Sequence, residues 1–254
     1  MKDRNNEPKP DVIAGRNPVN EAVRSDRAVD KILIARGERN GAVVGILAKA
    51  REKRIPVKEV DRQKLDFLSG GATHQGIIAL AAAKEYATVE DIFDCAESRG
   101  EPPFIIVLDE LEDPHNLGAI IRTAECTGAH GVIIPERRSA GLSYTVAKAS
   151  AGAVEYMRVA RVTNIARLID ELKARGVWVY GADMNGEDYA SCDMSGACAI
   201  VIGNEGKGIS RLVREKCDVI VSLPMQGHIN SLNASVAAGV LMYHAFEKRR
   251  GAHT

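Results

Sequence analysis

The sequence is poor in aromatic residues and in cysteine, and it lacks a long apolar run. Only 4% of the 254 residues are Phe, Trp or Tyr, so the core must be packed mainly from Val, Ile, Leu and Ala. The five cysteines form no Cys-x-x-Cys pair, which argues against a zinc site or a disulfide framework and favours a reduced, cytoplasmic protein. No apolar run approaches the ~20 residues of a membrane span, and the polar first ten residues do not resemble a signal peptide. We therefore expect neither a membrane partner nor a bound metal.

Charge is balanced overall but distributed unevenly along the chain. Residues 1–84 carry 17 Lys and Arg against 11 Asp and Glu, a net charge of +6. Residues 85–254 carry 17 against 23, a net charge of −6. A basic front end favours a polyanionic partner that docks there, although a scatter of solvated surface charges would produce the same totals.

The front of the chain alternates between strand and helix patterns. Residues 1–10 are charged and polar and are predicted to be a disordered tail. Residues 11–84 are predicted to form a small α/β domain, with strands near 31–35, 57–60 and 77–81. His74 lies in the last loop of this domain and is either a structural hydrogen-bonding residue or a ligand contact. Residues 85–103 are predicted to be a linker that contains a helical turn or two.

From residue 104 onwards, the strand patterns become continuous apolar runs. They lie at 104–108, 131–134, 177–180, 199–202 and 219–223. Runs without alternation predict strands that are covered on both faces, and therefore a parallel sheet in a three-layer α/β domain over residues 104–254. Ligands of such sheets bind beyond the carboxyl ends of the strands. The loops that follow residues 108, 202 and 223 are therefore the candidate site.

The first two of these loops carry unusual polar residues. After residue 108, Asn116 is a candidate helix N-cap, and Arg122 is the only basic residue of the helix that follows. Arg122 either belongs to a site or extends into solvent. After residue 202, three glycines surround Glu205, but the spacing matches neither a Walker loop nor a dinucleotide-binding fingerprint. A carboxylate between glycines is exposed unless it binds a ligand or another residue.

The third loop leads into an apolar C-terminal helix. Ser231 and Asn233 lie where the first turn of that helix leaves backbone N–H groups unsatisfied. They either cap the helix or line a ligand site.

Together, the three loops resemble the three motifs of the SpoU-type (TrmH) RNA 2′-O-ribose methyltransferases of the SPOUT superfamily. The residues that carry this resemblance lie at 116–124, 202–208 and 223–239, and their order and spacing are specific. The front domain, with its closing segment 74–76, resembles the small ribosomal-protein-like substrate-binding domain of many such enzymes. The resemblance implies a deep trefoil knot, S-adenosylmethionine as cofactor, and a homodimer with its active site at the interface.

The resemblance also implies roles for individual residues. It assigns S-adenosylmethionine binding to Gly203, Leu223 and Leu232, and a catalytic cluster to Asn116, Arg122, Glu205, Ser231 and Asn233. The family assigns Arg122 to activation of the ribose 2′-hydroxyl. Because a guanidinium has a pKa above about 12, stabilisation of the forming alkoxide is the easier role for Arg122. Glu205 is expected to orient Arg122 or Asn116.

A separate front domain makes the chain most similar to the enzymes that methylate a guanosine in the peptidyl-transferase region of 23S rRNA. The substrate is either the naked rRNA or a large-subunit assembly intermediate. The alternatives are a tRNA guanosine 2′-O-methyltransferase and a non-catalytic RNA-binding protein. Phe67 is the only aromatic residue before Tyr86. We therefore expect the front domain to recognise RNA mainly through phosphate and shape contacts.

Overall fold

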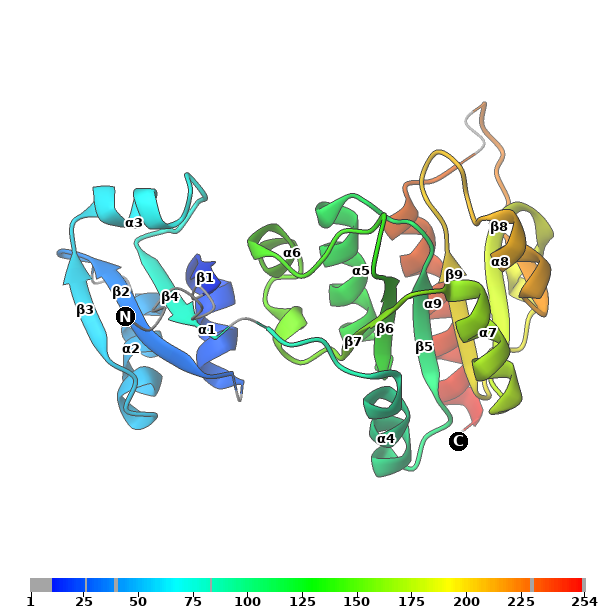
Figure 1. Cartoon of the computed structure of the whole chain (residues 1–254), viewed down its shortest axis with the longest axis horizontal. Helices are drawn as coiled ribbons and strands as arrows, with labels where there is room; N and C mark the ends of the chain where they lie inside the picture. Colours follow the sequence, from blue (N-terminus) through cyan, green and yellow to red (C-terminus); the bar gives the residue numbers. More distant parts are fainter. Residues whose placement is uncertain (1–10, 26, 39–40, 83, 229–230, 253–254) are drawn as a thin grey trace, which may run out of the picture. The chain divides into compact units, whose positions relative to one another are not determined.

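The computed structural model describes residues 11–25, 27–38, 41–82, 84–228 and 231–252. The chain divides into two compact units (Figure 1). Unit 1 comprises residues 1–85 and 142–156, and unit 2 comprises residues 86–141 and 157–254. The predicted tail, residues 1–10, lies outside the described residues.

Unit 1 is built on a four-stranded sheet with the order β1-β4-β2-β3. The β2–β3 pair is parallel and the other two pairs are antiparallel. Its elements are β1 (Asp11–Ala14), α1 (Arg16–Arg24), β2 (Val29–Ala35), α2 (Gly41–Glu52), β3 (Val57–Val60), α3 (Arg62–Leu68), β4 (Ile77–Ala81), α6 (Tyr144–Ala149) and the 3-10 helix η1 (Ala153–Glu155). Helices α1 and α2 cover one face of the sheet, and α3 covers the other with Tyr144 of α6.

Unit 2 is built on a six-stranded sheet with the order β10-β8-β9-β5-β6-β7, and every strand pair in it is parallel. The predicted parallel sheet is thereby confirmed. The elements are α4 (Val89–Arg99), β5 (Phe104–Leu108), α5 (Pro114–Cys126), β6 (Gly131–Pro135), β7 (Val159–Val162), α7 (Ile165–Ala174), β8 (Trp178–Asp188), η2 (Tyr189–Ser191), β9 (Cys198–Ile202), α8 (Arg211–Lys216), β10 (Val219–Ser222) and α9 (Ala234–Ala252).

Helices cover both faces of this sheet. Helices α4, α7 and α8 contribute Ile92, Leu168 and Val213 to one core. Helices α5 and α9 pack together on the opposite face, and Figure 1 shows α9, in red, running along the sheet there. The three-layer prediction is confirmed, but α4 is an 11-residue helix and is therefore longer than the predicted turn or two.

The strand order places the three candidate loops at one edge of the sheet. Strands β5 and β9 are neighbours, and β8 lies between β9 and β10. Because all of these strands are parallel, the loops after Leu108, Ile202 and Ser222 leave from the same carboxyl edge. Residues 229 and 230 of the third loop lie outside the described residues, and the knot implied by the resemblance stays a prediction.

Candidate active site

Helix α5 begins earlier than the sequence pattern indicated. Its N-cap is Asp113, whose Oδ1 accepts a hydrogen bond from the backbone N–H of His115 at 2.9 Å, and Pro114 is the first helical residue. The predicted N-cap at Asn116 is therefore wrong. An Asp followed by Pro is the stronger helix-start signal, because Pro presets the helical φ and needs no N–H partner. Asn116 lies inside the first turn and is buried.

Three of the five predicted catalytic residues are joined by hydrogen bonds. Asn116 Nδ2 donates to Glu205 Oε1 in the loop after β9. Asn233 Nδ2, just before α9, donates to Asn116 Oδ1 at 3.0 Å. The three candidate loops therefore meet at Asn116.

This chain of hydrogen bonds has a single direction. An ionised carboxylate can only accept, so the amide nitrogen of Asn116 faces Glu205 and its oxygen is left to accept from Asn233. Asn233 Oδ1 in turn accepts from the backbone N–H groups of Ser235 at 3.0 Å and Val236 at 3.4 Å. Asn233 therefore caps α9 and also joins the cluster, and its role in binding a ligand stays a prediction.

The glycine-rich loop holds Glu205 at its apex. Asn204 and Gly208 exchange two backbone hydrogen bonds, of 3.1 and 2.8 Å, which close the loop. The Asn204 side chain accepts from the backbone of Gly206 at 2.9 Å inside this loop. A Cβ atom on Gly203 would collide with the backbone of Gly208, so the closed loop requires glycine at this position.

Two further residues anchor this loop, and neither was singled out from the sequence. The buried Asp109 accepts a hydrogen bond from the backbone of Ser210 at 2.7 Å. Asn204 Nδ2 donates to the backbone carbonyl of Glu110 at 3.0 Å. The available signal was the position of Asp109 directly after an apolar strand, at the edge where the site was predicted.

Arg122 and Ser231 do not join the cluster. Both are exposed, and neither side chain makes a hydrogen bond or ion pair with another residue in the described part of the chain. Arg122 follows Asn116 by six residues, which turns the two side chains about 120° apart around α5. Of the two partners considered for Glu205, the structure shows Asn116. The catalytic roles stay predictions.

The three residues assigned to the cofactor lie along the same carboxyl edge. Gly203 is buried directly after β9, Leu223 is half-buried directly after β10, and Leu232 is exposed just before α9. The two leucines offer apolar surface, and the loop offers backbone N–H and C=O groups. Such a combination suits a purine ring, which needs a flat apolar slot and hydrogen bonds at its edges.

Comparison with known proteins identifies the family. Residues 103–243 match the model of the SpoU rRNA Methylase family, and residues 12–87 match that of the RNA 2′-O ribose methyltransferase substrate-binding domain. The chain belongs to the SpoU methylase family. A Bacillus subtilis relative, whose name assigns it only to the TrmH family of tRNA/rRNA methyltransferases, is 50% identical over 94% of this chain and 96% of its own length.

Solved structures of SpoU methylases share the fold. The AviRb methyltransferase of Streptomyces viridochromogenes, solved with S-adenosylmethionine, superposes with a TM-score of 0.78. The two proteins are 26% identical, over 94% of this chain and 90% of that one. An RNA 2′-O ribose methyltransferase structure superposes with a TM-score of 0.76 at 27% identity, over 94% of this chain and 88% of that one.

The hydrogen bonds of His74 in this SpoU methylase indicate a structural role. It is buried, its Nδ1 accepts a hydrogen bond from the backbone N–H of Gly76 at 3.0 Å, and its Nε2 lies 2.9 Å from Asp66 Oδ1. Both ring nitrogens are therefore occupied, one within the loop and the other by Asp66 of α3. Of the two interpretations of His74, this geometry favours the structural one.

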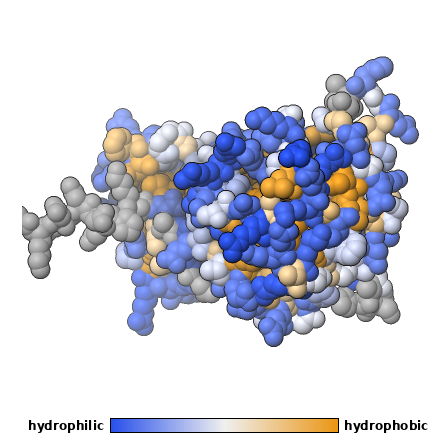
Figure 2. Space-filling view, turned by 45° about the vertical axis from the view of Figure 1, so that its right-hand side comes forward, coloured by the Kyte–Doolittle hydropathy of each residue, from blue (hydrophilic) through white to orange (hydrophobic). Residues whose placement is uncertain are grey.

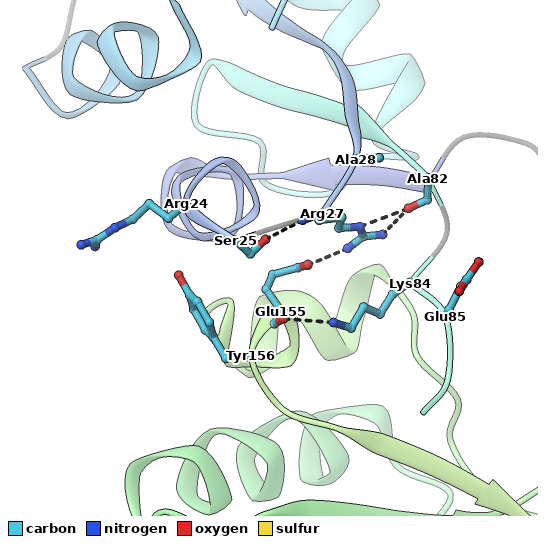
Figure 3. Close-up of a pocket in the computed structure, with 9 residues that line it drawn as sticks. All are labelled: Arg24, Ser25, Arg27, Ala28, Ala82, Lys84, Glu85, Glu155 and Tyr156. Atoms are coloured by element: carbon cyan, nitrogen blue, oxygen red, sulfur yellow. Dashed lines mark hydrogen bonds and ion pairs between the residues drawn. The ribbon is translucent and has the colours of Figure 1, made fainter. Parts of the chain in front are cut away.

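Unit 1 of this SpoU methylase contains a cavity of about 590 Å³, which no predicted site residue lines. Arg27 donates hydrogen bonds to Glu155 and Asp11, each at 2.6 Å, and to the carbonyl of Ala82 at 2.9 and 3.1 Å. Lys84 donates to the carbonyl of Glu155 at 3.0 Å. Figure 3 shows Arg27 and Lys84 approaching Glu155 from the same side. These charges largely satisfy one another, so the network holds residues 142–156 within unit 1.

Proposed function

We propose that this SpoU methylase transfers a methyl group to the ribose 2′-hydroxyl of a guanosine in the peptidyl-transferase region of 23S rRNA. Membership of the family makes the protein an S-adenosylmethionine-dependent RNA methyltransferase. The observation that carries the proposal is the hydrogen-bonded cluster of Asn116, Glu205 and Asn233. It brings together the three loops whose motifs define the resemblance.

Residues at the carboxyl edge of the sheet would hold the cofactor. We assign Gly203, Leu223 and Leu232 to it because they supply apolar surface and backbone groups at one edge. Bound S-adenosylmethionine supplies an already activated methyl group on a sulfonium. The protein therefore needs mainly to align the 2′-oxygen and to help it lose its proton.

Arg122 is the residue that we assign to the reacting oxygen. It is exposed and engages no other described side chain, so its guanidinium is available to RNA. A permanently charged group cannot take up the proton, but it stabilises a forming alkoxide and binds the neighbouring phosphate. Ser231 remains assigned to the same site because it lies in the loop that leads to Asn233.

We further propose that the enzyme is a homodimer. Helix α9 packs on the sheet through Leu241, Met242 and Ala245, yet Val236 and Tyr243 are each 50% exposed. With Val240, these two residues form an apolar stripe, because positions that are three and four apart share one face of a helix. Figure 2 shows apolar side chains at the surface among hydrophilic ones. A second copy that covers the stripe would remove it from water.

The front of the chain is proposed to capture the RNA. Residues 11–84 would form the substrate-binding part and residues 104–254 the catalytic part, with both acting in the cytoplasm. The net charge of +6 over residues 1–84 favours a polyanion. The substrate is either 23S rRNA or an intermediate of large-subunit assembly. No helix in the described ranges is long and apolar enough to cross a membrane.

The experiment that tests this proposal is methyl transfer from labelled S-adenosylmethionine to unmodified 23S rRNA and to unmodified tRNA, assayed side by side. Label at a ribose 2′-oxygen of 23S rRNA is the expected result. Label on tRNA alone would keep the chemistry and contradict the target. A protein that binds S-adenosylmethionine and labels neither RNA, nor a large-subunit assembly intermediate, would contradict the enzymatic proposal.

A further inference from the structure

Phe67 is the most exposed large apolar side chain in the described part of the chain. It lies on α3 of unit 1 and is 84% exposed. Two residues earlier, Leu65 is fully buried in the core between α3 and the sheet. Because residues two positions apart along a helix point 200° apart around its axis, α3 packs through Leu65 and turns Phe67 outwards. Among the described residues, Phe67 joins no aromatic pair and no hydrophobic core cluster.

The neighbours of Phe67 on the helix surface are polar. Gln63 and Lys64 precede it by four and three residues, and both are exposed. Residues at these spacings lie side by side on a helix. The outer face of α3 therefore presents one aromatic ring, one amide and one ammonium group.

The charges of this segment are available to an anion. The exposed side chains of Arg62 and Lys64 make no hydrogen bond or ion pair with another residue that the structure describes. The two acidic residues of the segment already have partners: Asp61 lies 3.5 Å from Arg36, and Asp66 is hydrogen-bonded to the imidazole of His74 at 2.9 Å. The charged side chains near Phe67 that have no partner are thus basic, which suits phosphate groups.

We propose that Phe67 is the stacking platform for an unpaired base of the RNA substrate, with Gln63 facing the base edge and Lys64 the adjacent phosphate. The inference rests on the proposed function, because it takes RNA as the ligand. Bases that are splayed out of loops or single strands stack on exposed aromatic rings, whereas paired bases are already stacked within their helix. A protein surface that contacts only the phosphate groups of RNA would not need the aromatic ring of Phe67.

Several features favour RNA over a protein partner for this surface. Residues 12–87, which include all of α3, match the model of an RNA substrate-binding domain. A protein partner would bury an apolar patch, but Phe67 is surrounded on α3 by charged and amide side chains. The proposal adds one specific base contact to the expectation that recognition rests mainly on phosphate and shape contacts.

The test compares Phe67→Ala, Phe67→Leu and Phe67→Trp with the parent enzyme, in binding of an unstructured oligouridylate of about ten nucleotides and in methyl transfer to the RNA that the parent labels. We expect the Ala and Leu variants to bind about 5- to 150-fold more weakly, which corresponds to the ~1–3 kcal/mol of one stacked base. KM for RNA should rise while kcat is retained. The Trp variant should restore both values, and single-stranded RNA should quench its indole fluorescence more than a fully paired duplex does.

Val44→Ala is the matched control. Val44 is also an exposed apolar residue of unit 1, but it lies on α2, which covers the opposite face of the sheet. Parent-like affinity and KM in the Ala variant would overturn the proposal, and so would a Leu variant that matches the parent. If the parent binds RNA but transfers no methyl group, the proposed function fails while the binding series still decides the role of Phe67.

Discussion

The side-chain amide of Asn233 donates a hydrogen bond to the side-chain oxygen of Asn116 at 3.0 Å and thereby joins the start of α9 to α5. Because Asn116 donates onward to Glu205, the negative charge at the far end orients both amides. The oxygen of Asn233 then faces the backbone N–H groups at the start of α9. A helix N-terminus carries a partial positive charge. The chain of hydrogen bonds therefore runs from the partial positive charge at the start of α9 to the negative charge of Glu205.

Asn116→Asp should disrupt this chain while hardly changing the volume of the side chain. The new carboxylate would face that of Glu205, and the donor that Glu205 requires would be lost. We expect a loss of about 1–3 kcal/mol of stability and a fall in turnover, measured by urea unfolding and methyl transfer. Asn164→Asp is the control, because Asn164 caps α7 as an acceptor and Asp serves equally well there. Equal effects of the two substitutions would contradict the role of the chain.

Arg122→Ala should nearly abolish turnover and leave affinity for S-adenosylmethionine unchanged. Removing one group that stabilises a developing negative charge typically costs about 10²–10³-fold in kcat. Arg122→Lys should retain part of the activity, because it keeps the charge and loses the planar fork. Glu125→Ala, at another exposed position of α5, is the control. Unaltered turnover in the Arg122→Ala variant would remove Arg122 from the site.

Gly203→Ala should lower cofactor affinity, because the added methyl group would collide with the backbone of Gly208 and force the closed loop open. Gly206→Ala, three residues later in the same loop, is the matched control. A Cβ atom there meets no atom closer than 3.5 Å, and Gly206 does not have a positive φ. Calorimetric titration with S-adenosylmethionine distinguishes the two variants. Equal affinities would show that the cofactor does not depend on this loop.

His130 should make unit 2 sensitive to acid. It is buried, its Nδ1 accepts from the backbone of Phe104 at 2.9 Å, and burial lowers its pKa below the usual 6.5 despite the nearby Glu101. As the pH falls below 6.5, the unfolded chain binds a proton at this residue that the folded chain does not, so stability falls. The slope reaches at most about 1.4 kcal/mol per pH unit for one proton.

His130→Asn keeps an acceptor for Phe104 and removes the titrating group, so its stability should depend less on pH between 7 and 5. Urea unfolding at several pH values measures this difference. Parallel pH profiles for the parent and the variant would show that another group is responsible.

Val240→Glu should convert the proposed dimer into a monomer, because it places a charge within the apolar stripe of α9. Light scattering after gel filtration measures the mass. If the active site forms at the interface, methyl transfer should be lost together with the dimer. Val44→Glu, on α2 of unit 1, is the control and should remain dimeric. A parent enzyme that is already monomeric would contradict the stripe as an interface.

The sequence predicted those parts of the structure that depend on local patterns. Continuous apolar runs such as 104–108 indicated a parallel sheet, because only strands covered on both faces can be apolar throughout. The same reasoning missed β7, where Arg161 interrupts an edge strand, and α8, which has six residues and only one buried side chain. Short, half-exposed elements leave little periodicity to detect.

The assembly of the site lies beyond local patterns. Asn116 is bonded to residues 89 and 117 positions away in the sequence, and no spacing rule connects them without the fold. The motifs placed these residues in one site by resemblance, but they did not indicate the direction of the hydrogen bonds between them. Similarly, the helical pattern around Leu65 and Phe67 did not say which of the two faces the core.

The membership of residues 142–156 in unit 1 has a consequence for engineering the enzyme. Tyr144 packs into the core beneath α3, and Glu155 pairs with Arg27 through two side chains that are almost fully buried. A gene fragment that ends after residue 84 would therefore encode an incomplete hydrophobic core and an arginine that has lost one of its two carboxylate partners. A recombination experiment that exchanges RNA specificity between relatives must therefore transfer two separate segments of unit 1. One precedes β5 and the other follows β6, so a single junction at the linker is not enough.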